Sequence, residues 1–145
     1  MTRGFSLIEM LIVIAIILVL LGVAIPNFLT VRHISAETVV IRELHTIYET
    51  QVQYLSQFGR YAATLAELGP AARGAGGPSA GNLIPASLAS GEKDGYAFEL
   101  MTTPGGFAVT ATPKVYGSTG RRSFYVEHSG VVRQNWGPEP ATGRE

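Results

Sequence analysis

The chain has 145 residues with 11 basic and 11 acidic side chains, so its formal net charge is zero at neutral pH. A balanced chain lacks the basic footprint of nucleic-acid binding. No nucleic-acid partner is therefore expected, and DNA uptake stays a minor alternative. Cysteine is absent, so no disulfide can hold the fold together.

The first 28 residues form the most informative segment of the sequence. A short basic leader, residues 1–4, precedes Phe5, and the stretch from Met10 to Ile25 contains no charged or strongly polar side chain. As a helix this stretch rises about 24 Å, and its apolar flanks extend it to about 36 Å, enough to cross a hydrocarbon core of about 30 Å. Arg3 is the only charge before Glu9, which predicts an N-terminus in the cytoplasm.

Glu9 is the unusual residue of this segment. An acid near the end of a membrane-length helix is costly unless a partner pairs with it. One interpretation is an interfacial acid that reaches water and has no role. The other is one half of a charge pair between copies of the chain.

The apolar segment as a whole has three interpretations. A secretory signal peptide would be cleaved after Gly22-Val23-Ala24, which leaves a secreted protein that begins at Ile25. A plain single-pass anchor would keep Met1. In the third interpretation the Gly4–Phe5 bond is cut, so the apolar stretch stays on the mature protein.

The third interpretation is supported by a resemblance. Arg3-Gly4-Phe5-Ser6-Leu7-Ile8-Glu9 resembles the class III signal of the type IV pilin and pseudopilin family, and Gly22, Pro26 and Asn27 lie where that family's helix usually carries them. The resemblance implies that a prepilin peptidase cuts after Gly4 and N-methylates Phe5. Methylation keeps the charge of an amine. Glu9 of one subunit would then pair with the Phe5 amine of its neighbour and set the axial register of assembly.

The resemblance also implies a function. The chain would be a structural subunit, not an enzyme, and its partners would be copies of itself, the peptidase and an inner-membrane assembly platform. It would wait in the bacterial cytoplasmic membrane and then enter an extracellular pilus, which serves adhesion or twitching motility, or a periplasmic pseudopilus of type II secretion. A minor pilin, a pseudopilin and an anchored or secreted binding domain are the alternatives.

Gly22 and Pro26 interrupt an otherwise good helix. Proline removes the hydrogen bond to the carbonyl of Gly22, and glycine weakens the same turn. A mild kink is one outcome, and the resemblance implies a second, in which the segment between them loses helicity when subunits pack. The assembly helix is assigned to residues 5–28.

Residues 29–58 continue the helix with one apolar face. Charged and amide side chains fall mostly between the apolar positions, and Gly59 is a stop signal. The predicted stripe consists of Ile34, Ile41, Leu44, Tyr48, Val52 and Leu55, widened by Val40, Ile47 and Phe58.

Residues 59–94 are predicted to form a loop region. Thr64 and Glu67 have the spacing of a capping box, which predicts a short helix there. Gly74-Ala-Gly-Gly77 superficially resembles a phosphate loop, but it lacks the lysine, the preceding strand and the following helix. This region is interpreted as an exposed face of the subunit.

Residues 95–136 are predicted to form three to four antiparallel strands. Alternating segments at 96–101, 107–112, 123–128 and 131–135 are separated by glycine-containing turns. The sheet and the amphipathic helix can cover each other. The predicted fold is therefore α+β and pilin-like, with a long N-terminal helix packed on the sheet and a flexible tail at 137–145.

No pattern points to catalysis, a cofactor or a metal. His33, His45 and His128 are far apart in sequence, and the acids are too scattered for the calcium site that the resemblance to major type II secretion pseudopilins would imply. Aromatic side chains could conduct electrons along a fibre, but at helical spacing they are more often packing residues. They include Phe5, Phe28, Tyr48, Tyr54, Phe58 and Tyr61.

Overall fold

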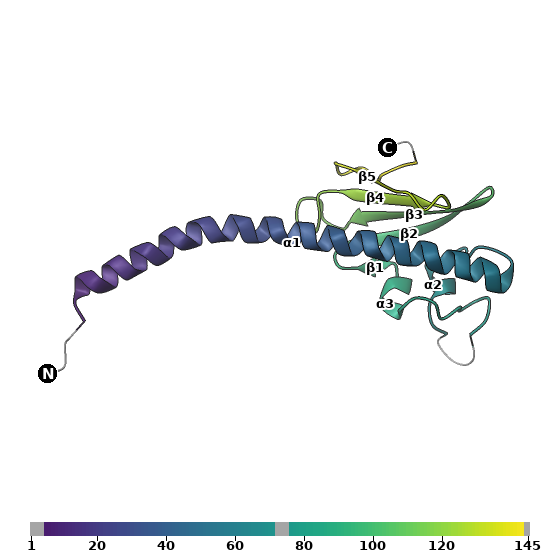
Figure 1. Cartoon of the computed structure of the whole chain (residues 1–145), viewed down its shortest axis with the longest axis horizontal. Coiled ribbons are helices and arrows are strands. Elements are labelled where there is room, and N and C mark those ends of the chain that lie inside the picture. Colours follow the sequence, from purple (N-terminus) through teal and green to yellow (C-terminus); the bar gives the residue numbers. More distant parts are fainter. Residues whose placement is uncertain (1–4, 72–75, 144–145) are drawn as a thin grey trace. The chain divides into compact units, whose positions relative to one another are not determined.

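The computed structural model describes residues 5–71 and 76–143, and of residues 26–33 only the helical backbone. The leader, with Gly4, lies outside the described residues. The longest element is a helix, α1 (Leu7–Phe58), shown in Figure 1. The chain divides into an N-terminal unit, residues 1–32, and a C-terminal unit, residues 33–145, which begins inside α1.

Helix α1 is continuous from Leu7 to Phe58, including Gly22 and the backbone of Pro26. It ends where Gly59 adopts a φ of 73° and donates its N–H to the carbonyl of Leu55 at 2.8 Å. A left-handed glycine at this position is a common helix stop. The loss of helicity between Gly22 and Pro26 on packing stays a prediction.

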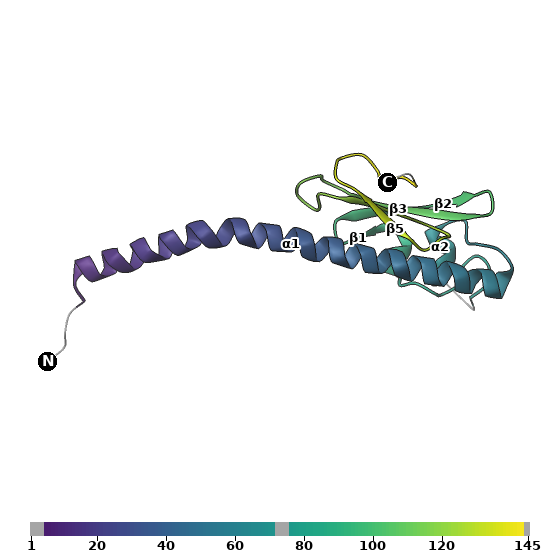
Figure 2. The ribbon, with the colours of Figure 1, turned by 45° about the horizontal axis from the view of Figure 1, so that its top comes forward.

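The sheet lies in the C-terminal unit and has five antiparallel strands in sequential order, rather than the predicted three to four. Figures 1 and 2 both show its longer strands beside the second half of α1. The strands are β1 (Glu92–Lys93), β2 (Tyr96–Thr103), β3 (Gly106–Pro113), β4 (Ser123–Glu127) and β5 (Val132–Asn135).

Strand β1 was not predicted, because a strand of two residues is too short to show an alternation of apolar and polar side chains. Its signal lies in the following turn, where Asp94 and Gly95 have φ values of 51° and 80°. Two consecutive positive φ values define the tight hairpin turn that an Asp-Gly pair favours. The turn pairs Lys93 with Tyr96 and so extends the sheet by one strand.

The second half of α1 packs on the sheet along a line of residues spaced three and four apart. This line differs from the predicted stripe, because Ile34 and Val52 are 56% and 46% exposed. Around the helix axis, the buried line is displaced toward Glu37 and Gln51, two polar residues that are not in the predicted stripe. Its members are Glu37, Val40, Leu44, Ile47, Gln51 and Tyr54.

Gln51 is buried without loss of hydrogen bonding. Its side-chain Nε2 donates to the carbonyl of Ala62 at 3.0 Å, and its Oε1 accepts from the N–H of Ala62 at 2.9 Å. Both polar ends of the amide are therefore satisfied, as a buried side chain requires. The pair also fixes the chain that leaves α1 against the helix.

Two one-turn helices, α2 (Leu65–Leu68) and α3 (Ala86–Ala89), lie in the predicted loop region and bury Leu68 and Leu88 in the core. The predicted cap of α2 is confirmed, because the N–H of Glu67 donates to the Thr64 hydroxyl at 3.4 Å. In Figure 1 these helices lie below α1 and the longer strands above it.

The Glu67 carboxylate holds the start of the loop region together. It accepts hydrogen bonds from Arg60 at 2.8 Å, the N–H of Ala63 at 3.0 Å and the Tyr54 hydroxyl at 3.3 Å. Burial raises the pKa of Glu67, but the hydrogen bonds from Arg60 and Ala63, the charge of Arg60 and the Tyr54 bond outweigh it and lower the pKa below its usual range. The single Tyr54 hydroxyl proton is shared between the Glu67 carboxylate and the carbonyl of Pro78.

The stretch after β5 is bonded to the sheet and partly buried, although its composition predicts a flexible tail. The Ser123 hydroxyl donates to the carbonyl of Glu139 at 2.7 Å. Ala141 is 1% exposed. The described part of this stretch, residues 137–143, is thus held by a hydrogen bond and by packing.

We predict that Glu67→Gln lowers the free energy of unfolding by about 1 kcal/mol at neutral pH, because charge-assisted hydrogen bonds are lost. The folded-state pKa of Glu67 lies below its unfolded value. Its contribution is therefore complete above the unfolded pKa and disappears as the pH falls through the folded pKa. Denaturant unfolding of both proteins between neutral and strongly acidic pH measures the difference.

The matched control is Glu92→Gln, which removes an ion pair with Lys114 whose two side chains are 60% and 48% exposed. Such a pair contributes little to stability. A stability difference for Glu67→Gln that does not shrink on acidification would contradict the stabilising role of its ionised form.

Candidate functional site

The first part of α1 presents an apolar surface that is not buried among the residues that the structure describes. The span Leu7–Ile25 is one helix, long and apolar enough to cross a membrane, with no part of it buried. Its large apolar side chains, together with that of Phe5, are between 44% and 83% exposed. At about 1.5 Å per residue the span rises about 28 Å, close to the thickness of a hydrocarbon core.

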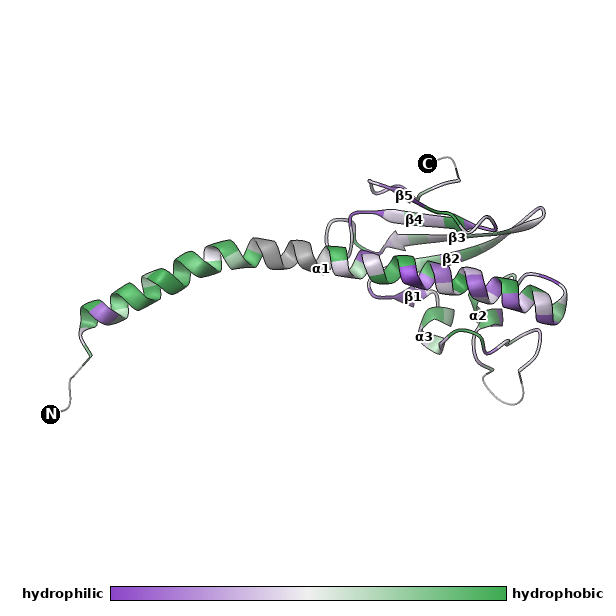
Figure 3. Cartoon of the chain, viewed as in Figure 1, coloured by the Kyte–Doolittle hydropathy of each residue, from purple (hydrophilic) through white to green (hydrophobic). Residues whose placement is uncertain are grey.

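Length and composition alone do not separate a membrane span from a signal sequence, because a signal sequence is also a long apolar segment near the N-terminus. Figure 3 shows the apolar colour continuing along this part of the helix, with a hydrophilic place at its start. That place lies in the first turn, where Glu9 is the acidic residue. An exposed surface of this size needs a cover of lipid or protein.

The Glu9 carboxylate lies against the start of its own helix. Its Oε2 accepts the N–H of Ser6 at 3.1 Å, and the N–H of Met10 donates to the carbonyl of Ser6 at 3.3 Å. The first N–H groups of a helix lack partners within it and carry partial positive charge. Glu9 therefore caps the helix and keeps its charge beside residue 6.

This cap is half of a capping box, in which the acid three residues after the cap position reaches back to that position's N–H. In the sequence, the three-residue spacing of Ser6 and Glu9 is the signal for this cap. Phe5 is the next residue toward the N-terminus and is 74% exposed. Within one chain, the structure thus places the Glu9 carboxylate against the residue that follows Phe5.

The other predicted site residues lie along or before this helix. A Cβ atom added to Gly22 would meet nothing within 4 Å, so no contact in the described chain requires glycine there. Pro26 has a helical backbone, and its side chain lies outside the described residues, as does Gly4. The roles of Gly4, Phe5, Glu9, Gly22 and Pro26 stay predictions.

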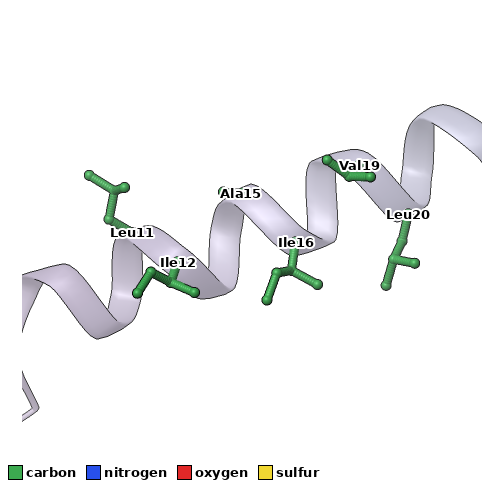
Figure 4. Close-up of a pocket in the computed structure, with 6 residues that line it drawn as sticks. All are labelled: Leu11, Ile12, Ala15, Ile16, Val19 and Leu20. Carbon is green, nitrogen blue, oxygen red and sulfur yellow. The ribbon is translucent and has the colours of Figure 1, made fainter.

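A shallow groove runs along the apolar span between two rows of side chains spaced four residues apart. Ala15 has the smallest side chain of the residues that line it. Rows with this spacing are the ridges and grooves through which helices pack on one another. Figure 4 shows the six lining residues, Leu11, Ala15 and Val19 in one row and Ile12, Ile16 and Leu20 in the other.

Comparisons with known proteins agree with this arrangement. Residues 1–25 match the family described as the prokaryotic N-terminal methylation motif. Residues 86–144 match a second family, described as a protein of unknown function (DUF2950). No solved structure matches the chain.

Two relatives are type IV pilus proteins. The type IV major pilin protein PilA of Myxococcus xanthus is 39% identical over 67 residues, which cover 46% of this chain and 30% of the relative. The type IV wide pilus major component PilA4 of Thermus thermophilus is 42% identical over 66 residues, which cover 46% of this chain and 50% of the relative. The matches thus span half of these relatives' length or less.

The fold is α+β, with a membrane-length apolar helix that continues into a helix-on-sheet unit. With the match to the methylation motif over residues 1–25 and the two relatives, it supports a type IV pilin.

We predict that the combined substitutions Ile12→Asp and Ile16→Asp release the protein from membranes. Each acid at the centre of a span costs about 3 kcal/mol, so the pair removes about 6 kcal/mol of insertion free energy. The fraction that stays with the membrane after washing with alkaline carbonate measures the effect.

The matched control is Ile12→Leu with Ile16→Leu, which changes the shape of the same groove and keeps it apolar. Full retention of the double aspartate variant would contradict a membrane-spanning role for Leu7–Ile25.

Proposed function

We propose that this protein is the structural subunit of a type IV pilus-like filament. The observation that carries the proposal is the exposed apolar helix with its single acid in the first turn, within a methylation motif. Both relatives named above are major pilus components. Their names favour the main subunit over a minor pilin or a type II secretion pseudopilin.

Processing is the first step of the proposed route. A prepilin peptidase cuts after Gly4, and the new amino group of Phe5 is methylated. The amine stays cationic after methylation. The mature chain then begins with a positive charge next to Ser6, whose N–H the Glu9 carboxylate already accepts.

Residence in the membrane is the second step. The span Leu7–Ile25 crosses the bacterial cytoplasmic membrane, and Arg3 favours a cytoplasmic N-terminus before cleavage. Glu9 lies in the first turn, at the edge of the bilayer, where the cap and nearby water lower the cost of its charge.

Assembly is the third step. An inner-membrane platform moves the subunit out of the lipid, and the apolar helix is covered again by the helices of neighbouring subunits. The groove beside Ala15 is a surface for that packing. Glu9 of the incoming subunit pairs with the Phe5 amine of a neighbour, and the pair defines how far one helix is displaced along the next.

The charge pair matters because the packed helices exclude water. Removal of one partner of a buried ion pair leaves an uncompensated charge and costs about 3–5 kcal/mol. At about 1.4 kcal/mol for each factor of ten, such a loss weakens the contact by about 100-fold or more. The monomer concentration needed for assembly rises by the same factor.

We predict that Glu9→Gln and Glu9→Ala both abolish filaments at normal expression while membrane insertion is kept. Glutamine is the sharper variant, since its side-chain oxygen still accepts the Ser6 N–H and only the charge is lost. Fibres sheared from the cell surface are counted by electron microscopy, and the mass of the N-terminal peptide reports cleavage and methylation.

Glu49→Gln is the matched control, because Glu49 is an exposed acid in the second half of α1. It should assemble normally. Normal fibres from Glu9→Gln would overturn the charge-pair mechanism and leave only a capping role.

The N-terminal mass also separates the classes of protein. A mature chain that begins at methylated Phe5 supports the filament class. A chain that begins at Ile25 indicates a secreted domain, and an intact Met1 indicates an anchor. Identification of the chain as the most abundant protein of the fibres would establish it as the main subunit.

A further inference from the structure

The sheet of the C-terminal unit has two open edges. At one edge β1 is only two residues long, so it covers the start of β2 and leaves residues 99–103 with no second neighbouring strand among the described residues. At the other edge β5 has a neighbour only on the side of β4. A strand edge with free N–H and C=O groups is a template for a further strand.

The free backbone groups of β2 belong to Leu100 and Thr102. The N–H of Phe98 donates to the carbonyl of Gly91 at 2.7 Å, on the side of β1. Residues two apart in a strand direct their backbone groups to the same side, so those of Leu100 and Thr102 point away from β3. No described residue bonds them on that side.

The free backbone groups of β5 belong to Val132 and Gln134. The N–H of His128 donates to the carbonyl of Phe107 at 3.2 Å, so even-numbered residues on the β4 side bond to β3. The odd-numbered residues of β4 therefore bond to the residues opposite them, which are the odd-numbered residues of β5. The N–H and C=O of Val132 and Gln134 then point out of the sheet, where no described residue bonds them.

The two open edges run in opposite directions. Each strand of the sheet is antiparallel to the next, so β5 runs opposite to β2. A second copy that is displaced sideways in the plane of the sheet, without being turned over, brings its β2 antiparallel to β5 of the first copy. The helix-covered faces of both sheets stay on the same side. In the proposed filament all subunits point the same way, which is the relation between copies that this pairing needs.

We propose that β5 of one subunit adds to the open edge of β2 in a neighbouring subunit and joins their sheets. The contact is heterologous, so it repeats along a fibre instead of ending at a dimer. The inference deepens the proposed function, on which it rests, by naming a second contact between subunits besides that of the apolar helices.

The free groups determine the register of this contact. Backbone bonds form where outward-pointing residues lie opposite one another. Gly91 occupies the edge of β2 before residue 99, so the added strand has to lie beyond it. Only one antiparallel register then places both outward residues of β5 opposite outward residues of β2. In it, Leu100 lies opposite Gln134, and Thr102 lies opposite Val132.

Charge supports the same register. Leu100 and Val132 pack against the core of their own unit. The residue next to each, Glu99 and Arg133, therefore lies on the opposite face of the sheet. Across the proposed contact Glu99 lies diagonal to Arg133 of the neighbouring subunit, which is within reach of a long side chain. The two opposite charges favour this alignment.

The absence of cysteine allows a test by cross-linking of full-length subunits in assembled fibres. Thr103 lies opposite Val131 of the neighbour, in a pair without backbone hydrogen bonds, whose Cα atoms are about 4.5 Å apart. This separation suits a disulfide. Within one subunit β3 and β4 lie between the two residues and separate them by about 14 Å, so a disulfide has to join two copies.

Fibres of Thr103→Cys combined with Val131→Cys are oxidised with diamide and separated by denaturing electrophoresis without reductant. We expect a ladder of dimers, trimers and longer chains, because each copy carries one thiol at each edge. Each single variant should stay monomeric. Fibres of the double variant that also stay monomeric would overturn the edge contact.

Val115→Cys combined with Val131→Cys is the matched control. The two positions are 57% and 55% exposed, and Val115 lies in the loop after β3. We expect only monomers from this pair. An equal ladder would overturn the proposal, because it would show that exposed thiols cross-link without opposed strands.

Thr102→Pro tests the backbone bonds themselves. Proline lacks the N–H that Thr102 directs at the neighbour, whereas the bonds between β2 and β3 are kept because Thr102 makes none of them. Added to the cysteine pair, it should lower the cross-linked fraction about tenfold, and Thr102→Val should leave it unchanged. Equal cross-linking with proline would overturn strand addition.

Failure of this contact is distinguishable from failure of the proposed function. If the unaltered chain forms no fibres, the proposed function is overturned together with the contact. If fibres form and the cysteine pair does not cross-link in them, only the contact is overturned.

Discussion

The apolar surface of the span Leu7–Ile25 is the constraint on which the rest of the molecule depends. None of it is buried within the described part of the chain, so a membrane or another protein has to cover it. Burial of apolar surface is favourable in proportion to its area and does not depend on direction. Lipid and neighbouring helices therefore satisfy the same requirement, so the proposed function can use one segment first as a membrane anchor and then as the centre of a fibre.

The two halves of α1 differ in which of their faces are apolar, although they form one continuous helix. The first half is apolar on all sides and carries its one acid in the first turn, where the Ser6 N–H binds it. The second half is covered by its own sheet along one line of residues. Two polar members of that line, Glu37 and Gln51, each have partners in the sheet loops or the following chain. These hydrogen bonds determine which face of the helix packs on the sheet, in addition to its apolar character.

Hydrophobic periodicity was enough to predict the long helix and the four longer strands, because each spans several repeats of its pattern. It placed Val40, Leu44 and Ile47 correctly in the core, but it included the exposed Ile34 and Val52 and left out the polar members of the buried line. The partners of Glu37 and Gln51 decide that line, and they lie 85 and 11 residues away in sequence. A charged residue looks like solvent-facing surface until its partner is known.

Only part of the candidate site could be predicted from the sequence. Phe5 and Glu9 followed from a local motif, which needs no tertiary information. The groove beside Ala15 depends on the side-chain rows of the folded helix, and the sequence analysis did not single it out. The two-residue strand β1 shows the opposite case, since only its Asp94-Gly95 turn carried a signal.

The lack of cysteine in the sequence has a practical consequence for the C-terminal unit. Its last strands are fastened by the Ser123 hydroxyl, the Glu37–Arg122 pair and the packing of Ala141, none of which requires an oxidant. Folding of the C-terminal unit is thus independent of thiol-oxidising enzymes. Reducing surroundings, which cut the cross-links of many secreted proteins, leave this one chemically unchanged.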